Sequence, residues 1–314
     1  MERSILDRHD RMKRRITLNG FFYAAISSAS FGFSPLFSLA LIAGGLTYFD
    51  ILSYRWGVSA IVLIIYALIK GKTLKLTSSS EIWKVVLLSA LRAITSITLL
   101  IGYANIASGI ASTINFMYPV IVAICMMTFF GERKSWTTIG AILVSIIGVY
   151  LMASGDGSSV DGGKIGLGLA CSLISAFSFA AYYIVLKRTK ADKIEAVKFT
   201  TWIMILSTIY FMAAGLIFDG HLTIVTDGLL WANILGLGLW STMVSNFTGV
   251  KAVRRIGPTL TSILGALQPL TAVILGAIFL DEHLGLSSVF GIILILVAVT
   301  VIVLGQNKKH HLLP

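Results

Sequence analysis

Long apolar runs alternate with short polar segments from one end of the chain to the other. Each run is close to the roughly 20 residues that a helix needs to cross the hydrocarbon core of a membrane. The pattern therefore predicts an all-α integral membrane protein with ten transmembrane helices. We place these helices near residues 18–41, 48–69, 82–104, 109–130, 136–153, 165–186, 199–218, 228–250, 258–280 and 286–304.

The basic residues fall almost entirely on alternate sides of these runs, and this predicts the orientation. Of the 25 lysines and arginines, 22 lie in segments on one side, Lys164 lies on the other, and Arg55 and Arg92 lie within runs. Cytoplasmic loops of membrane proteins carry an excess of basic residues. We therefore expect both termini in the cytoplasm. The bias also supports ten helices, because one helix more or fewer would place basic segments on both sides of the membrane.

The composition agrees with a membrane protein. The chain is 56% hydrophobic and 12% charged, which excludes an ordinary soluble domain. The net charge of +11 is expected to face anionic lipid at the cytoplasmic surface, and no nucleic-acid partner is predicted. Cys125 and Cys171 both fall within apolar runs, so no disulfide is expected.

The chain also repeats itself. At an offset of 150 residues, Pro119 matches Pro269 and Glu132 matches Glu282, so each half has a mid-helix proline followed thirteen residues later by a glutamate. Each half holds five predicted helices, an odd number, so the second half must enter the membrane from the opposite face. Inverted repeats of this kind alternate between inward-open and outward-open states around a site near the bilayer midplane.

This repeat divides the chain into five segments. They are a basic cytoplasmic N-terminus (1–17), a first five-helix repeat (18–153), an outer linker (154–164), a second five-helix repeat (165–304) and a cytoplasmic C-terminus (305–314). Two matched units without an extramembrane domain indicate solute transport by alternating access.

Several motif residues support a family resemblance. They are Tyr103-Ala104, Arg55, the stretch from Pro119 to Gly131-Glu132-Arg133, and its second-half counterpart from Pro269 to Asp281-Glu282-His283. With ten helices in two repeats, the chain resembles the drug/metabolite transporter superfamily in its EamA-type form. The resemblance implies a central cavity formed mainly by helices 1, 3, 4, 6, 8 and 9, with metabolites, amino acids or nucleotide-linked compounds as substrates. The chain departs from the common pattern at Asn246, where a tyrosine is frequent.

Arg92 is the strongest candidate for substrate binding. It lies about eight residues past Lys84, roughly 12 Å into a core about 30 Å thick. An arginine at that depth costs several kcal/mol unless it meets water, polar groups or an anion, and its helical neighbours are not acidic. In one interpretation, the planar guanidinium of Arg92 donates hydrogen bonds to a substrate carboxylate or phosphate. The other is a structural arginine that bonds the carbonyls of broken helices.

Further residues are expected along the cavity. Arg55 is shallower, so we expect its side chain to reach the outer interface, or to add positive potential to an outer vestibule if it points inward. The remaining candidates carry polar or aromatic groups at membrane depth, either as cavity lining or as ordinary packing. They are Phe31, Ser34, Asn115, Tyr118, Tyr182, Tyr183, Trp240, Asn246 and Gln268, with Trp240 expected beside Tyr182, Tyr183, Phe31 and Ser34 in one aromatic wall.

Four residues are candidates for hinge or gating roles. Pro119 and Pro269 each remove a backbone hydrogen bond and permit a bend. Glu132 and Glu282 end helices at opposite faces, where a gate or an ordinary solvated charge would both fit. Since no histidine or carboxylate is expected deep in the membrane, we predict facilitated transport or exchange without a buried proton relay.

The sequence thus predicts a secondary transporter of small organic solutes, anionic or zwitterionic, that exports metabolites or amino acids across a bacterial inner membrane. Uptake or exchange of a charged metabolite is the alternative, since orientation does not fix direction. An integral-membrane enzyme acting on lipid is a third possibility, but no nucleophile or metal cluster is visible. We expect no enzymatic activity, no cofactor and no bound metal.

Overall fold

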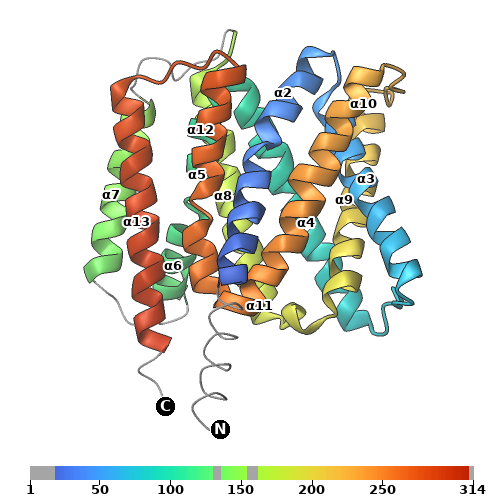
Figure 1. Ribbon diagram of the computed structural model, residues 1–314, viewed down its shortest axis with the longest axis horizontal. Helices are drawn as coiled ribbons and strands as arrows, with labels where there is room; N and C mark the ends of the chain where they lie inside the picture. The colour runs from blue at the N-terminus through green and yellow to red at the C-terminus, as the bar shows by residue number, and fades with distance from the viewer. Residues whose placement is uncertain (1–17, 130–135, 154–161, 311–314) are drawn as a thin grey trace, which may run out of the picture.

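The computed structural model describes residues 18–129, 136–153 and 162–310. Throughout these ranges the regular elements are helices, which stand side by side and nearly upright (Figure 1). The N-terminal segment 1–17, most of the predicted linker 154–164 and Glu132 lie outside the described residues. The first repeat is therefore described without its last connection.

Seven of the helical stretches are long and apolar enough to cross a membrane. They are Leu18–Ala43, Tyr48–Ile69, Ser79–Asn105, Ser108–Phe129, Ile165–Leu186, Ala196–Phe218 and Gly228–Gly249. Three shorter apolar helices, Ile139–Met152, Leu267–Phe279 and Leu286–Val301, complete the set. The predicted runs are thus mainly helical where the structure describes them, and seven of them are long enough to cross a membrane. The multi-pass membrane class is confirmed, while the count of ten spans stays a prediction.

The individual elements subdivide these stretches. They are α2 (Ser34–Ala43), α3 (Tyr48–Ile69), α4 (Ser79–Asn105), α5 (Ser108–Asn115), α6 (Tyr118–Phe129), α7 (Trp136–Ala153), α8 (Ile165–Arg188), η1 (Ala191–Lys193), α9 (Ala196–Phe218), α10 (Gly228–Leu235), η2 (Gly236–Val244), α11 (Ser245–Leu264), α12 (Leu267–Phe279) and α13 (Leu286–His310). The first span, Leu18–Ala43, is interrupted at Phe33, just before α2.

Side-chain caps fix where several helices begin. The Thr47 hydroxyl accepts from the Asp50 amide at 3.2 Å, and the Asp50 carboxylate accepts from the Thr47 amide at 3.3 Å, so α3 starts with a capping box. At the start of α4 the Ser78 side chain accepts from the Glu81 amide, and at the start of α10 the Asp227 side chain accepts from the Leu230 amide. The polar segments of the sequence thus supply the acceptors that free backbone amides need.

The two mid-membrane prolines lie at helix breaks, which differs from the expected bent but continuous helices. Pro119 stands in the first turn of α6, after α5 has ended at Asn115, and Pro269 stands in the first turn of α12. Proline fits the first turn because the missing N–H has no partner there in any case. Each proline therefore begins a new half-helix instead of kinking an old one.

A wide helical turn lies in the predicted span 228–250. Residues Gly236–Val244 form a π-helix between α10 and α11, and the helix then continues through the predicted loop 251–257 to Leu264. Such π segments are rare and occur mainly at functional sites. The loop prediction was wrong here, because the residues joining the two spans are themselves helical.

The helices of one half pack on helices of the other half, and these contacts come in matched pairs. The second helices, α3 and α9, pack on each other, as do α7 with α13 and α5 with α12. The third helix of the first half, α4, packs on the first helix of the second half, α8, and the reverse pairing, α2 with α10 and η2, also occurs. Contacts that come in exchanged pairs indicate an approximate two-fold relation between the halves.

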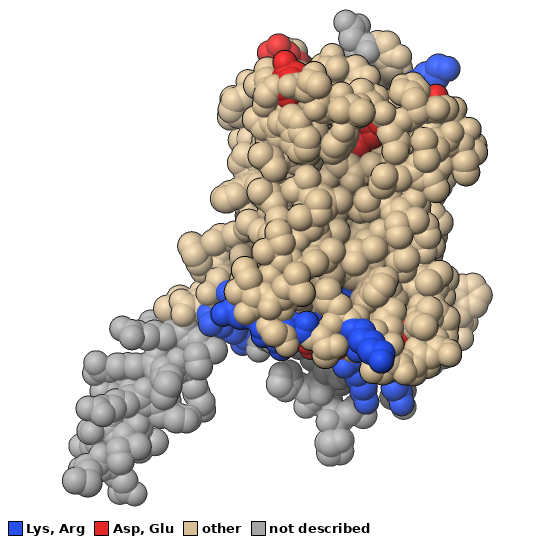
Figure 2. Space-filling model, turned by 90° about the vertical axis from the view of Figure 1, so that its right-hand side faces the viewer, with Lys and Arg blue, Asp and Glu red and all other residues tan. Residues whose placement is uncertain are grey.

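The arrangement leaves two helix pairs at the edges and the other helices between them. In Figure 1, α7 and α13 lie at one edge, α3 and α9 at the other, and α4, α5, α8 and α12 in the middle. The start of the first span and the end of α13 lie at the same lower end (Figure 1). On the face drawn in Figure 2, most Lys and Arg side chains gather at this end, and most Asp and Glu side chains at the other.

Candidate functional site

Arg92 stands in the middle of α4, thirteen residues from Ser79 at one end and thirteen from Asn105 at the other. Its guanidinium carbon lies 5.6 Å from the Trp56 ring centroid, 4.9 Å from that of Phe179 and 5.5 Å from that of Tyr182. Trp56, on α3, is buried to 1% exposure. The guanidinium therefore lies inside the bundle, between α3 and α8.

The positive charge of Arg92 is held by rings and not by a counter-charge. Within the described part of the chain, no hydrogen bond or ion pair to its guanidinium is found, although the residue is partly exposed. A central arginine costs about 3 kcal/mol on insertion scales. Three cation–π contacts at about 0.5–1 kcal/mol each offset a cost of that size. The N–H groups at the edge of the guanidinium stay free for a ligand.

Arg55 lies inside the protein, so the expectation that it reaches the outer interface was wrong. Its Nε–H donates to the Thr242 hydroxyl at 2.9 Å and its Nη1–H donates to the Ser34 hydroxyl at 3.1 Å. Its guanidinium carbon is 5.5 Å from the Phe31 ring centroid and 5.9 Å from that of Trp56. Two hydroxyls and two rings hold the side chain in place, and its exposure is 6%.

The π-helix supplies one of these hydroxyls. Thr242 accepts from Arg55 and donates to the carbonyl of Leu237, five residues earlier, at 2.9 Å. The Ser59 hydroxyl on α3 donates to the carbonyl of Gly238 at 2.8 Å. The wide turn thus opens a backbone carbonyl to a side chain of the other repeat, and it places Thr242 opposite Arg55.

An aromatic cluster extends from Arg92 toward the break between α5 and α6. The Tyr118 ring centroid lies 4.7 Å from that of Phe179 and 5.1 Å from that of Tyr183, and Phe179 lies 6.1 Å from Tyr182. Of the predicted residues, Tyr182 thus contacts Arg92 directly, and Tyr118 is connected to it through Phe179. Rings stacked in this way form a firm apolar surface beside the charge.

Two buried polar groups beside these elements have no partner. The Trp56 Nε1–H and the Asn115 Oδ1 are enclosed without a hydrogen bond from the described residues. Asn115 is the last residue of α5, at the break. An unpaired buried polar atom costs about 1–3 kcal/mol, and native structures retain few of them. Both groups are suitable partners for a polar ligand.

The other residues that were predicted to line the cavity lie in different parts of the structure. The Asn246 amide donates to the Thr242 carbonyl at 2.6 Å, within its own helix and next to the Arg55 contact. The backbone carbonyl of Gln268 lies against Gly32, beside Phe31. Trp240 is 47% exposed and makes an edge contact with Phe33 at 6.4 Å.

The predicted aromatic wall is therefore in two parts. Tyr182 and Tyr183 lie with Arg92, whereas Trp240, on the π-helix, makes its recorded ring contact with Phe33. The sequence placed both groups at mid-membrane depth but gave no information on which side of its helix each ring lies. Trp240 lies within the π-helix, and its side chain is exposed.

Glu282 is not the freely solvated helix-end charge that one reading of the sequence expected. Its Oε1 accepts from the Ser108 amide at 2.8 Å and its Oε2 accepts from the Ser108 hydroxyl at 3.0 Å. A carboxylate at the N-terminus of α5 satisfies the free amides there. Burial raises the pKa of this carboxyl above its usual value, and the hydrogen bonds from Ser108 and Gly109 partly offset the shift. Glu282 thus connects the second repeat to the first.

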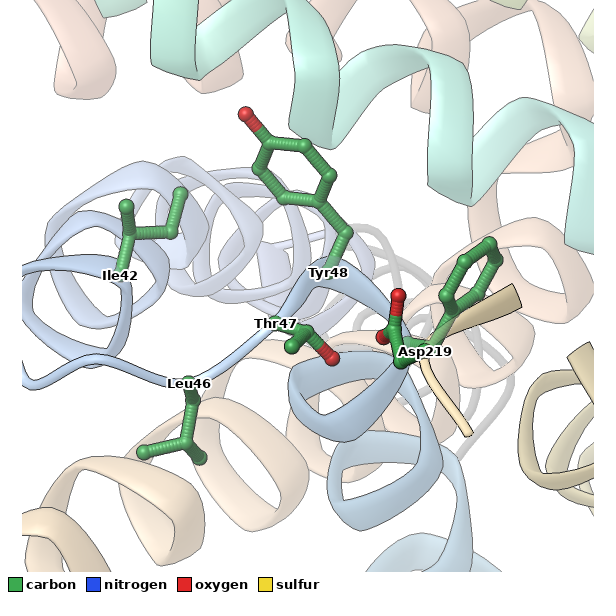
Figure 3. Close-up of a pocket in the computed structure, with 6 residues that line it drawn as sticks. Ile42, Leu46, Thr47, Tyr48 and Asp219 are labelled. Carbon is green, nitrogen blue, oxygen red and sulfur yellow. The ribbon is translucent and has the colours of Figure 1, made fainter. Parts of the chain in front are cut away.

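A surface pocket lies apart from these groups. It has a volume of about 370 Å³ and is formed where the connection from α2 to α3 meets Asp219 at the end of α9 (Figure 3). Its lining residues are Ile42, Leu46, Thr47, Tyr48, Phe49 and Asp219. None of the arginine contacts described above involves these residues, so this pocket is separate from the arginine site.

Sequence reasoning missed three residues that define the arginine site. Trp56 contacts both guanidinium groups, Phe179 contacts Arg92, and Thr242 bonds Arg55. Trp56 aligns with Trp202 of the second half at an offset of 146 residues. The Trp202 Nε1–H donates to the Leu74 carbonyl, whereas that of Trp56 has no partner among the described residues. No sequence signal pointed to Thr242, because its exposure to Arg55 depends on the π turn.

Comparison with known families matches both halves of the chain, over residues 18–154 and 166–304, to the EamA-like transporter family. The chain belongs to this family. The resemblance stated from the Pro119 and Pro269 motifs is confirmed, and so is the internal duplication, since each half matches separately. This EamA-like transporter is a multi-pass membrane protein, and the general transport function follows from its family.

Several curated proteins resemble this chain, and two of them are named as transporters without a substrate in the name. The chain is 25% identical to the "Uncharacterized transporter sll1319" of Synechocystis over 68% of its own length and 64% of that protein. It is 22% identical to the "Uncharacterized transporter YvbV" of Bacillus subtilis, with 78% and 79% covered. It is also 22% identical to the "WAT1-related protein At3g28050" of Arabidopsis thaliana, with 90% and 83% covered.

One solved crystal structure shares the fold over nearly its whole length. It superposes with a TM-score of 0.64 at 13% sequence identity, and the match covers 94% of this chain and 99% of that one. At this identity the likeness concerns the fold alone. The arrangement of helices is therefore one that a natural protein adopts.

Proposed function

We propose that this EamA-like transporter moves a small organic solute with a carboxylate group, such as an amino acid or another metabolite, by alternating access. The main support for this proposal is the position of Arg92. Its side chain lies midway along α4 against three rings and has no hydrogen-bond partner among the described residues. A guanidinium with free N–H groups binds a carboxylate in a bidentate geometry. The substrate is the counter-charge that the protein does not supply.

The surrounding groups suit an organic solute better than a bare ion. The rings of Tyr118, Phe179 and Tyr182 offer apolar surface beside the charge. The unpaired Asn115 Oδ1 is an acceptor that suits the ammonium group of a zwitterion. Binding sites for small molecules combine this kind of apolar lining with a few polar groups.

The transport mechanism rests on ten spans in two units of opposite orientation. The exchanged helix contacts support a two-fold relation, and the breaks before Pro119 and Pro269 provide places where half-helices change their angle. The gathering of basic residues at the end where the first described span starts and α13 ends supports a cytoplasmic location for that end (Figure 2). The bacterial relatives favour the plasma membrane.

We further propose export as the net direction, with uptake or exchange of a charged metabolite as the alternative. The contacts of the site are compatible with either, because a binding site at mid-membrane depth serves both directions. Counterflow in proteoliposomes against imposed gradients distinguishes them.

Substrate-dependent thermal stability tests the proposed carboxylate site. The purified protein is heated with amino acids and small organic acids, and in parallel with the amide of each acid. We expect stabilisation by at least one acid and not by its amide, loss of the effect in Arg92→Ala, and its retention in Arg188→Ala at the exposed end of α8. Equal stabilisation of the wild type and Arg92→Ala by the same acid would reject the site.

A further inference from the structure

A second guanidinium lies next to the proposed carboxylate site. Arg55 and Arg92 both contact the indole of Trp56, with guanidinium carbons 5.9 Å and 5.6 Å from the ring centroid. The two positive charges are close enough to act on each other electrostatically. Two like charges in a low-dielectric interior repel each other strongly, so this arrangement needs a compensating feature.

The protein supplies little compensation among its described residues. The partners of Arg55 are the neutral hydroxyls of Ser34 and Thr242, and those of Arg92 are aromatic rings. The recorded lysine ion pairs, Lys72 with Glu195 and Lys198 with Glu81, lie away from both arginines. The two positive charges thus share one region of the interior without a carboxylate that bonds either of them.

Among the described acidic residues, Glu282 has an indirect electrostatic link to Arg55. Both groups act electrostatically on Tyr103, the buried tyrosine near the end of α4. The oxygens of Glu282, however, already accept hydrogen bonds from the Ser108 amide and hydroxyl. This carboxylate is therefore engaged at the start of α5 and does not bond the arginine pair.

Each arginine keeps donors available. Arg55 uses two of its five N–H groups, at Nε and Nη1, for hydrogen bonds with described residues, and Arg92 uses none. Ring faces hold a guanidinium by its plane and leave its N–H edge open. The pair therefore presents two separate guanidinium groups near one indole, that of Trp56, whose own N–H has no hydrogen-bond partner among the described residues.

From this juxtaposition we infer that the substrate is a small organic dianion, with one acidic group bound by Arg92 and the other by Arg55. The inference rests on the proposed carboxylate site and adds a second anionic group to it. A dianion neutralises both charges, whereas a substrate with one carboxylate leaves a net positive charge between the repeats. Dicarboxylates and phosphorylated carboxylates share this chemistry, and the experiment separates them.

The test compares solutes that differ by one acidic group. Purified wild-type protein is titrated at constant ionic strength with succinate against succinamate, and with 3-phosphoglycerate against glycerate, with thermal stability as the readout. We expect at least one pair in which the dianion gives half-maximal stabilisation at a concentration ten-fold or more below its partner. The pair that responds identifies a dicarboxylate or a phosphorylated substrate.

Variants of Arg55 assign the second group. Arg55→Gln is expected to bind both members of the responding pair equally, at about the wild-type concentration for the single-acid member, because Arg92 remains. Arg55→Lys keeps the positive charge, so we expect it to fold and to retain a preference for the dianion. Arg92→Gln is expected to lose binding of both members.

The outcomes separate the two proposals. If no pair favours the dianion, or if Arg55→Gln keeps the full preference, the dianion inference is overturned while a carboxylate site at Arg92 still stands. If Arg55→Lys folds but treats both members alike, the inference is also overturned. If wild type and Arg92→Gln bind every member equally, the proposed function fails, and the dianion inference fails with it.

Discussion

At the scale of single residues, the proposed site depends on Arg92, whose guanidinium lies against the rings of Trp56, Phe179 and Tyr182 at the middle of α4. The depth of Arg92 follows from counting along one helix, and so did the lack of a nearby acidic residue. Its ring contacts come from α3 and α8, far away in the sequence, and helix periodicity does not reveal which faces of those helices meet. The sequence therefore predicted Arg92 and missed Trp56 and Phe179.

The sequence did not reveal the surroundings of Arg55 either. Its position one turn past Asp50 suggested an arginine that reaches the interface, since long side chains commonly do so. The structure instead gives it hydroxyl partners from Ser34 and Thr242. One of these partners depends on a helix break and the other on a π turn, and neither irregularity is visible in the hydrophobic pattern.

Glu282 leads to a prediction about pH. Burial raises the pKa of this carboxyl in the folded protein, so the folded state favours the protonated form. Its contribution to stability is then greatest below the ordinary glutamate pKa of about 4.3 and is lost as the pH rises through the raised value. We expect the melting temperature of the wild type relative to Glu282→Gln to be higher at about pH 5 than at about pH 8.

The exposed neighbour Asp281 provides the control for this prediction. Asp281→Asn changes a carboxylate at the same end of the molecule without a recorded contact to α5, and asparagine tolerates its positive φ of 51°. The same comparison with Asp281→Asn should show little change between the two pH values. A wild-type minus Glu282→Gln difference that grows with rising pH would contradict the assignment.

At the scale of elements, the hydrophobic pattern predicted the positions of the helices well and their interruptions poorly. The apolar runs coincide with helices because about 20 apolar residues have no stable alternative in a membrane. The breaks before Pro119 and Pro269 were expected as bends, since proline marks a lost hydrogen bond without fixing how far the helix opens. The π-helix was not predicted, because its residues carry no distinctive composition.

The pairing of α7 with α13 gives a prediction at this scale. A Cβ at Gly148 on α7 would lie 2.7 Å from Ile295 Cγ1 and 2.9 Å from the Gly291 carbonyl oxygen on α13. Because one of these contacts is backbone, the helices must separate to admit a methyl group, at a cost of about 1–3 kcal/mol. We expect Gly148→Ala to lower the melting temperature of the detergent-solubilised protein by several degrees.

Gly140 on the same helix is the matched control, since a Cβ there meets no atom within 4 Å. Gly140→Ala should leave the melting temperature unchanged or raise it slightly, because alanine favours the helix. Equal melting temperatures for the two variants would mean that α7 and α13 do not pack as closely as described.

At the scale of the whole molecule, the duplication was the most informative feature of the sequence. The matched spacing of Pro119 and Pro269 predicted two equivalent halves, and the separate family matches confirmed them. Exchanged helix contacts then give the pair a two-fold relation. The arginine site draws on both halves, with Arg92, Arg55 and Trp56 from the first and Phe179 and Thr242 from the second.

A site shared between two halves is what alternating access requires, because a relative movement of the halves then exposes the same groups to each side in turn. The substrate identity was beyond the sequence for a physical reason. It depends on the spacing of a few groups contributed by distant helices, and that spacing is set by packing and not by local pattern.

Flux in proteoliposomes is the most direct test of the central claim that Arg92 binds the transported solute. The acid that gives the largest thermal stabilisation is used in counterflow with wild type, Arg92→Ala and Arg188→Ala at equal amounts of reconstituted protein. The account predicts at least a ten-fold loss of flux in Arg92→Ala and near wild-type flux in Arg188→Ala. Wild-type flux through folded Arg92→Ala would contradict it.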